Sequence, residues 1–325
     1  MQRQGGWLSP EKVSTLQKGV LAACDGLDGL KDGIISNIEA CSKAFDPIAL
    51  RCEGCQNTGD GCLSDAEIAV VKTIHAKYEF DFPLANAAVS RPGWGYGGET
   101  QPGGMKELLT GAKAPVFPPL SGTDSRSRPA LAAVASGQSQ GWLIGDGTVR
   151  YIFARDAKFD TPKFNPQTFA SRIQQVSELL DATNPDLSAF KRRGGKLIMR
   201  TNLADYIVGP FATMDYYNAV VKVMGNDAVD QFIRYYVSPG SAHSGATFSG
   251  IDSAPVPTQA DLLGVLESWV ERDQAPPYRL TQSLHTKEAP FSVVAARPMC
   301  AYPTYPHSIG GGNPKDAESY QCREP

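Results

Sequence analysis

The chain has 325 residues, 42% hydrophobic residues and a formal net charge of −3, a composition typical of globular proteins with one large or two modest domains. This weakly acidic charge argues against a nucleic-acid-binding role, and the longest basic cluster is the short run Lys191-Arg192-Arg193. No apolar stretch approaches the length of about 18 residues that a membrane span needs. We therefore expect neither a nucleic acid nor a membrane as a partner.

Seven cysteines fall into local groups separated by chain rich in glycine and proline. This distribution is expected of disulfides that close loops, and it predicts an oxidising location, secreted or periplasmic. An alternative for the middle group is half a zinc site at Cys52-x-x-Cys55, although no histidine lies close to it in the sequence. The first seven residues lack the apolar core of a signal peptide, so we expect the chain to be incomplete. The groups are Cys24/Cys41, Cys52/Cys55/Cys62 and Cys300/Cys322.

The first predicted element is a helix from Pro10 to Cys24, and an aspartate- and glycine-rich loop, residues 25–34, follows it directly. Its carboxylates, together with backbone carbonyls freed by a tight glycine-rich wrap, are the oxygen ligands that calcium prefers. The EF-hand spacing is absent, and the plain alternative is a surface turn. Because Cys24 and Cys41 flank the loop as if to staple it, we favour a calcium site.

A capping box at residues 64–67 predicts a helix that runs to about Tyr78, within which His75 is a packed or surface residue rather than a metal ligand. From residue 81 to about residue 147, proline, glycine and serine dominate, with aromatic residues interspersed. Such a stretch predicts a long irregular excursion of the kind that forms lids and binding loops.

Beyond Gly194 the pattern changes to alternating strands and helices. Residues 196–200 are typical of a buried strand, which ends at residues 201–205, and helical patterns cover residues 213–224 and 228–233. A second strand at 234–237 ends in residues 238–245, and a helix is predicted over residues 259–272. This order predicts an α/β sheet with a catalytic edge.

The two predicted strands end in residues with catalytic chemistry. Asp205 follows the first strand and His243 follows the second, which is the order in which an α/β-hydrolase delivers the acid and the base of its triad. A rival nucleophile is Ser139 in Gly137-Gln-Ser139-Gln-Gly141, which satisfies G-x-S-x-G. That motif needs a strand before it and a helix after it, and neither the residues at 129–135 nor those at 142–147 show the required pattern. We expect Ser139 to be a lid residue instead.

Several stretches together resemble the tannase/feruloyl esterase family, which also contains terephthalate monoester hydrolases. They occur in the family's order and span nearly the whole chain. They are Cys24-Asp-Gly-Leu-Asp-Gly-Leu-Lys-Asp-Gly-Ile34, Phe45-Asp-Pro with Leu50-Arg-Cys52, Cys62-Leu-Ser, Gly194-Gly-Lys-Leu-Ile with Ala204-Asp205, Pro239-Gly-Ser-Ala-His243, and Arg297-Pro-Met-Cys300-Ala-Tyr-Pro303 with Cys322.

The resemblance implies a fold, a calcium site and a triad. The fold would be α/β: a large, mostly irregular and helical calcium-binding lid domain at 1–187, and the C-terminal half of an α/β-hydrolase core at 188–325, carrying Asp205 and His243. The implied disulfides are Cys24–Cys41, Cys52–Cys62 and Cys300–Cys322, which leaves Cys55 unpaired. Calcium would be held by the carboxylates of Asp25, Asp28 and Asp32 and by the backbone carbonyls of Leu30 and Ile34.

Two departures from the family pattern affect function. Ser244 stands where the family has a cysteine bonded to one beside the nucleophile, and the family's nucleophile elbow, Gly-Cys-Ser-x-Gly-Gly, does not occur before Asp25. We expect a serine carboxylic-ester hydrolase for esters of small aromatic acids, with Trp94 and Trp142 as candidate ring contacts and the nucleophile segment missing from this chain. The alternative is a non-catalytic remnant or binding module that keeps the calcium-stapled lid.

Overall fold

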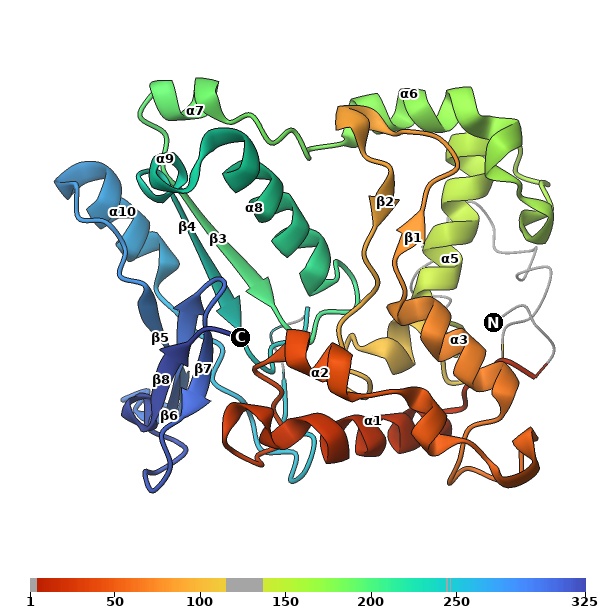
Figure 1. Cartoon of the computed structure of the whole chain (residues 1–325), viewed down its shortest axis with the longest axis horizontal. Helices are drawn as coiled ribbons and strands as arrows, with labels where there is room; N and C mark the ends of the chain where they lie inside the picture. The colour runs from red at the N-terminus through yellow and green to blue at the C-terminus, as the bar shows by residue number, and fades with distance from the viewer. Residues whose placement is uncertain (1–4, 115–136, 244, 246) are drawn as a thin grey trace. The chain divides into compact units, whose positions relative to one another are not determined.

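A computed structural model (Figure 1) describes residues 5–114, 137–243, 245 and 247–325. Residue contacts divide the chain into two units. The first unit combines residues 1–16, 47–94 and 103–184, and the second combines 17–46, 95–102 and 185–325. The predicted boundary at residue 187 lies close to the division at 184/185. However, residues 25–34 and 95–102 belong to the unit with the large sheet, not to the unit that contains most of the predicted lid.

The sheet of the second unit has four strands in the order β3-β4-β6-β5. Strands β3 (Leu197–Asn202) and β4 (Ile233–Ser238) are parallel, in register from Leu197↔Ile233 to Asn202↔Ser238. Strand β6 (Val293–Ala301) runs antiparallel to β4, and β5 (Arg279–His285) runs antiparallel to β6. The predicted strands at 196–200 and 234–237 are therefore confirmed as neighbours.

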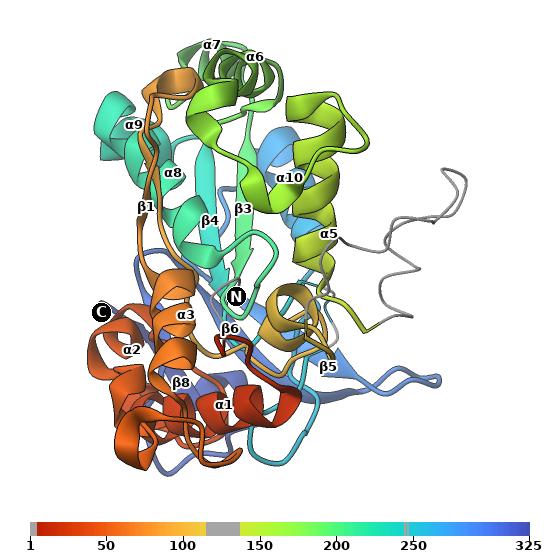
Figure 2. The same cartoon turned by 90° about the vertical axis from the view of Figure 1, so that its right-hand side faces the viewer.

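Helices cover both faces of β3 and β4, since α8 (Pro210–Met224) and α10 (Leu262–Arg272) lie on either side of them (Figure 2). The strand alternation explains this arrangement: Leu197 and Met199 pack with the cluster around Val220, whereas Ile198 packs with the cluster around Tyr236. Such two-sided burial is typical of parallel strands.

Two helical predictions in this region need correction. Helix α9 covers only Asn226–Asp230, because Ile233 pairs with Leu197 and begins β4, although residues 228–233 were predicted to be helical. Helix α10 begins at Leu262 instead of residue 259, because the backbone of Gln259 bonds to Ser283. In both cases sheet pairing overrides local helical preference.

The rest of the second unit is held by short elements and disulfides. Strands β7 (Tyr305–Ser308) and β8 (Tyr320–Arg323) form an antiparallel pair, and Cys322 is bonded to Cys300 of β6. The aspartate-rich loop begins with a 3₁₀ turn, η1 (Asp25–Asp28), and Cys24 is bonded to Cys41 in α2 (Ile38–Ala44). A further 3₁₀ turn, η9, covers Ala317–Ser319, and α7 covers Ser188–Arg192.

The first unit is mainly helical. Helix α1 (Pro10–Cys24) begins in this unit and continues into the second, and α3 (Asp65–His75) starts with the predicted capping box of Ser64 and Glu67. The helix ends at His75 rather than near Tyr78, which belongs to a short strand. Cys52 and Cys62 are bonded, and Cys55 is free and exposed.

The stretch predicted to be irregular contains regular structure in its described part. Strand β2 (Ser90–Arg91) lies in this stretch and pairs with β1 (Tyr78–Glu79), which precedes it. Helix α5 (Gln140–Gly147) follows Ser139, which corrects the prediction that no helix starts there. No helix among the described residues is long and apolar enough to cross a membrane. The other elements are η2 (Pro47–Leu50), η3 (Glu53–Cys55), η4 (Ala85–Ala87), the π-helices η5 (Lys106–Thr110) and η6 (Thr148–Ala154), η7 (Thr161–Lys163), η8 (Pro166–Phe169) and α6 (Ala170–Leu180).

Candidate functional site

Asp205 and His243 meet at the carboxyl ends of the two parallel strands. The loop after β3 carries Asp205 and the loop after β4 carries His243, and the His243 Nδ1 lies 2.9 Å from the Asp205 Oδ2. The other carboxylate oxygen of Asp205 accepts hydrogen bonds from the backbone amides of Ile207 and Val208, at 2.7 and 3.2 Å. The predicted hydrogen bond between the two side chains is therefore present, and the carboxylate is fixed at both oxygens.

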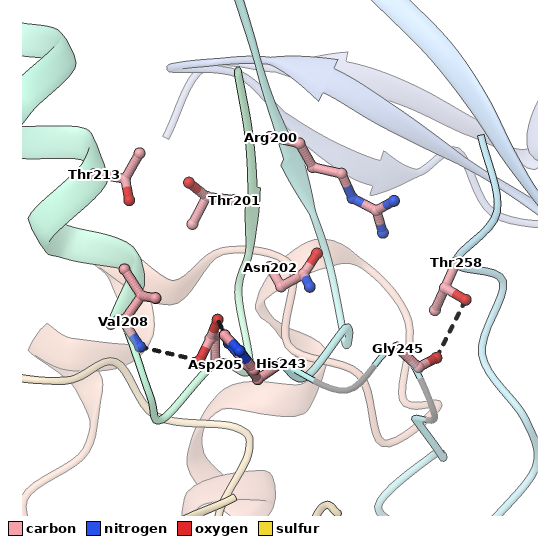
Figure 3. Close-up of a pocket in the computed structure, with 10 residues that line it drawn as sticks. Arg200, Thr201, Asn202, Asp205, Val208, Thr213, His243, Gly245 and Thr258 are labelled. Carbon is pink, nitrogen blue, oxygen red and sulfur yellow. Dashed lines mark hydrogen bonds and ion pairs between the residues drawn. The ribbon is translucent and has the colours of Figure 1, made fainter. Parts of the chain in front are cut away.

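The imidazole of His243 opens onto a pocket. Its side chain is 44% exposed, whereas Asp205 is buried behind it. The pocket has a volume of about 410 Å³, and Figure 3 shows both side chains among the residues that line it. A carboxylate at Nδ1 favours the tautomer protonated there, which leaves the Nε2 lone pair free to accept a proton. Ser244, the residue that departs from the family pattern, lies outside the described residues.

Residues 97–101, which sequence reasoning missed, form hydrogen bonds with the segments that carry Asp205 and His243. The buried Glu99 accepts hydrogen bonds from Gly97 N at 2.9 Å and from the hydroxyl of Tyr206, the neighbour of Asp205, at 3.3 Å. Gln101 exchanges two hydrogen bonds with the backbone of Phe248, downstream of His243. Burial raises the pKa of the Glu99 carboxyl.

A glycine in the same segment is required by close packing. A Cβ on Gly98 would lie 2.4 Å from the carbonyl oxygen of Ala204, so only glycine lets this segment approach the Asp205 loop so closely. The sequence signal for this contact was the Gly97-Gly98 pair, but nothing in the sequence says which loop it approaches.

The hydroxyl of Ser139 forms hydrogen bonds with the backbone around the start of helix α5. Its hydroxyl donates to the carbonyl oxygen of Leu108 at 2.6 Å and accepts from Trp142 N at 3.2 Å, which makes it the N-cap of α5. The side chain is also buried. A nucleophile elbow presents its hydroxyl on a strand-to-helix turn, and residues 129–135, where that strand would lie, fall outside the described residues. This geometry supports the role of a structural residue.

Two aspartates of the loop at residues 25–34, Asp28 and Asp32, face a buried arginine. Arg297, with only 3% of its side chain exposed, lies 2.7 Å from Asp32 Oδ2 and 3.5 Å from Asp28 Oδ2. Asp25 instead accepts a hydrogen bond from Gly33 N at 2.8 Å. The described residues contain no group of three acidic, histidine or cysteine side chains gathered closely enough to hold a metal. Asp28 and Asp32 thus share Arg297, whereas Asp25 faces the backbone amide of Gly33, and the predicted convergence of all three carboxylates is not seen in this arrangement.

The composition of this loop nevertheless fits a divalent cation. The loop carries three carboxylates, of which Asp28 and Asp32 share one guanidinium, and Asp28 Oδ2 is buried without a hydrogen-bond partner among the described residues. Burial raises the pKa of Asp28 to about 6, although Arg297 acts in the opposite direction, and burial also raises the pKa of Asp25. Additional positive charge would relieve this excess. Calcium binding stays a prediction, as do the roles of the Leu30 and Ile34 carbonyls as ligands.

The remaining sequence predictions have clear outcomes. Each of the three predicted disulfides is formed, which removes the zinc alternative because Cys52 is bonded to Cys62. His75 is packed, with its Nδ1 2.8 Å from the carbonyl oxygen of Trp94, and burial lowers its pKa to about 4. The roles of Trp94 and Trp142 as ring contacts stay predictions.

Comparison with known proteins identifies a family. The sequence model described as tannase and feruloyl esterase matches residues 1–323. An uncharacterized esterase of Agrobacterium fabrum is 31% identical over 99% of this chain and 54% of its own length. The mono(2-hydroxyethyl) terephthalate hydrolase of Piscinibacter sakaiensis is 30% identical over 98% of this chain and 52% of its own length. The chain thus spans about half the length of the curated relatives that it matches.

Solved structures show the same fold. The crystal structure of an esterase from Aspergillus oryzae matches 99% of this chain and 58% of its own, with a TM-score of 0.73 and 23% identity. The crystal structure of feruloyl esterase B from Aspergillus oryzae matches the same shares, with a TM-score of 0.72 and 21% identity.

Proposed function

Because the chain belongs to the tannase and feruloyl esterase family, we propose that it carries the acid and the base of a serine carboxylic-ester hydrolase. The observation that supports this most directly is the 2.9 Å contact between His243 Nδ1 and Asp205 Oδ2 at the ends of adjacent parallel strands. Sites in α/β sheets gather at this edge. Residues 188–325 would then form the C-terminal half of an α/β-hydrolase core.

In the proposed reaction, His243 transfers the proton, and Asp205 orients and stabilises the imidazole. The His243 Nε2 accepts the proton of a serine hydroxyl as that oxygen attacks the ester carbonyl, and then gives the proton to the departing alcohol. Asp205 stays ionised, holds the imidazole in the required tautomer and stabilises the transient imidazolium. The two amide hydrogen bonds from Ile207 and Val208 keep the carboxylate in place throughout.

The nucleophile of this reaction is a separate proposal. The sequence contains no Gly-Cys-Ser-x-Gly-Gly elbow, and no serine among the described residues hydrogen-bonds to His243 Nε2. Since the hydroxyl of Ser139 is already engaged, we propose that a serine outside this sequence supplies the nucleophile. The chain alone is then expected to hydrolyse no ester at an enzymatic rate.

The proposed substrates are esters of small aromatic acids. Two relatives support this by name, one as a probable feruloyl esterase and one as a mono(2-hydroxyethyl) terephthalate hydrolase. Trp94 and Trp142 are the candidate ring contacts. The three disulfides support a secreted or periplasmic location, since such bonds persist in oxidising compartments.

We also propose a structural calcium at residues 25–34. The carboxylates of Asp25, Asp28 and Asp32 would hold it, together with the backbone carbonyls of Leu30 and Ile34. When bound, the ion would supply positive charge to a loop in which carboxylates outnumber cations. It would take no part in proton transfer.

Imidazole NMR and an ester assay test the proposed triad together. Nitrogen-15 NMR of the purified chain should show His243 protonated at Nδ1 and unprotonated at Nε2. Hydrolysis of p-nitrophenyl and feruloyl esters should be no faster for the wild type than for His243→Gln. Turnover that disappears in Ser139→Ala would identify Ser139 as the nucleophile. Turnover that survives in both variants, or a ring protonated at Nε2 alone, would refute the assignment of His243 as the base.

A further inference from the structure

A serine and a histidine outside the pocket of Asp205 and His243 form a hydrogen-bonded pair. Ser283 and His285 lie two residues apart on strand β5, which places their side chains on one face of the sheet, and Ser283 Oγ is 2.7 Å from His285 Nε2. Both side chains are partly exposed. Because the strand order is β3-β4-β6-β5, the pair lies on the opposite edge strand from β3 (Figure 2). It is therefore separate from the proposed triad, whose residues follow β3 and β4.

The contacts of the imidazole determine which of its nitrogens carries the proton. His285 Nδ1 lies 2.7 Å from the backbone carbonyl oxygen of Phe291. A carbonyl oxygen only accepts hydrogen bonds, so Nδ1 is the protonated nitrogen of the neutral ring. The Nε2 lone pair then accepts the hydroxyl proton of Ser283. In this arrangement a histidine acts as general base for a serine, with a backbone carbonyl in the place that a carboxylate takes in a triad.

Two irregularities of the backbone occur at this pair. Phe291, which supplies the carbonyl, has a φ of 54°, a left-handed conformation that is uncommon for a bulky side chain. Its side chain is 59% exposed, so burial of the ring does not account for this conformation. The register also shifts between Leu284 and His285, where Val294 is left unpaired. Strained residues and bulges are both frequent at sites where a side chain is held for chemistry.

The surface beside the pair suits a small apolar group. Val293 is the register partner of His285, and Ala296 is that of Ser283, so these two side chains share a face with the pair. Val293 is 58% exposed and Phe291 is similarly open to solvent. The short side chain of Ala296 leaves space beside the hydroxyl. A small apolar acyl group would therefore contact Val293 and Phe291 while its carbonyl carbon lies at Ser283.

The backbone of Ser283 limits what the pair can achieve. Ser283 N donates to Gln259 O at 2.8 Å, and Gln259 N donates to Ser283 O at 3.1 Å. The amide of the serine is therefore not available to stabilise an oxyanion, a contribution that is large in serine hydrolases. We expect reaction only with activated esters that have good leaving groups, and transfer of one acyl group per chain instead of turnover.

We propose that Ser283 is an acyl-accepting nucleophile with His285 as its base, and that it takes the acyl group of activated esters of small apolar acids. Ser283 Oγ bonds to the ester carbonyl carbon as Nε2 takes the hydroxyl proton. The bond to the leaving alcohol then breaks, and Nε2 returns the proton to that alcohol. The products are a Ser283 ester and one equivalent of free alcohol. This inference does not rest on the proposed function, since neither Asp205 nor His243 takes part.

Labelling of the purified chain with p-nitrophenyl acetate, followed by peptide mass spectrometry, tests this proposal. Ser283 should be acetylated at the same rate in wild type and in His307→Gln, the matched control, whose partly exposed ring lies on β7. In His285→Gln the rate should fall roughly a hundredfold, the lower end of the usual contribution of a general base. Ser42 is an exposed serine whose hydroxyl donates to a backbone carbonyl, and it provides a slower reference in the same digest.

Three results would overturn the proposal. They are equal labelling of Ser283 in wild type and His285→Gln, labelling of Ser283 no faster than that of Ser42, and a His285 ring protonated at Nε2 in nitrogen-15 NMR. The NMR measurement uses wild type, so it keeps the test decisive if circular dichroism shows that His285→Gln is not folded. Because the adduct is assigned to a residue, failure of the proposed triad leaves this result unaffected, and failure of Ser283 labelling leaves the triad unaffected.

Discussion

Two aspartate-bearing regions of the second unit use charge in opposite ways. In the loop at residues 25–34, the buried Asp28 and the partly exposed Asp32 face the buried Arg297, with carboxylates in excess. At the sheet edge, Asp205 faces His243, which is 44% exposed, and the nearby Arg200 has no acidic partner among the described residues. The first region is closed and internally paired, and the second is open and incompletely paired.

The difference indicates which region stabilises and which reacts. Buried ion pairs become costly when one partner is removed, whereas exposed groups can exchange partners with a ligand. The two regions are also in contact, because Asp32 O accepts a hydrogen bond from Ser249 Oγ and Gly33 O accepts one from Gly250 N, downstream of His243. We infer that the aspartate loop supports the loop that carries the proposed base.

Removal of Arg297 should have the largest effect on stability. Arg297→Gln leaves the buried Asp28 and the partly exposed Asp32 without their cation, which should lower the free energy of unfolding by about 3–5 kcal/mol. Urea unfolding in the presence of a chelator measures this. The matched variant is Arg200→Gln, which strands no carboxylate among the described residues and should cost less than about 1 kcal/mol. Equal losses for the two variants would remove the distinction between a paired and an unpaired arginine.

Addition of calcium should have the next largest effect. If the ion binds only the folded chain, calcium at one hundred times its dissociation constant should add about 2.7 kcal/mol to the free energy of unfolding. Thermal unfolding in calcium and in EDTA measures this, with Asp28→Asn as the variant that should lose the response. Asp273→Asn, at an exposed position, should keep it. A wild-type melting temperature that is the same in both buffers would argue against the calcium site.

The features that could be predicted from the sequence lie in short stretches or in family motifs. Asp205 and His243 each follow a strand whose apolar run is visible locally, and resemblance to a known family gave the disulfide pairing. The features that were missed depend on residues far apart. Asp32 meets Arg297 across 265 positions and Glu99 meets Tyr206 across 107, so neither pair has a local pattern. Helix α5 was missed because its glycines weaken the helical signal, while the Ser139 cap that starts it is local.

Glu99 tests whether a buried carboxyl beside the proposed site makes the stability of the chain depend on pH. Burial raises the pKa of its carboxyl above the unfolded value, so its stabilising contribution is complete below the unfolded pKa and is lost as pH rises through the folded pKa. Glu99→Gln keeps an oxygen for Gly97 N and Tyr206 Oη but does not ionise. Wild type should therefore lose stability relative to the variant as pH rises through the folded pKa. Urea unfolding from acidic to neutral pH measures this, and parallel pH profiles would contradict it.

Asp205→Asn should have the smallest effect on stability, but it should change the tautomer of His243. The asparagine oxygen can still accept from the amides of Ile207 and Val208, so the free energy of unfolding should stay within about 0.5 kcal/mol of wild type. The amide nitrogen, however, replaces the oxygen that faces His243 and donates to Nδ1, so the ring proton moves to Nε2 and the base loses its free lone pair. Nitrogen-15 NMR of the ring and urea unfolding of the same sample measure both effects. Asp28→Asn provides the contrast, because it should alter unfolding in calcium and leave the His243 tautomer unchanged. If Asp205→Asn is instead as destabilising as Arg297→Gln, Asp205 belongs with the closed, stabilising acids and the assignment of a reactive edge loses its main support.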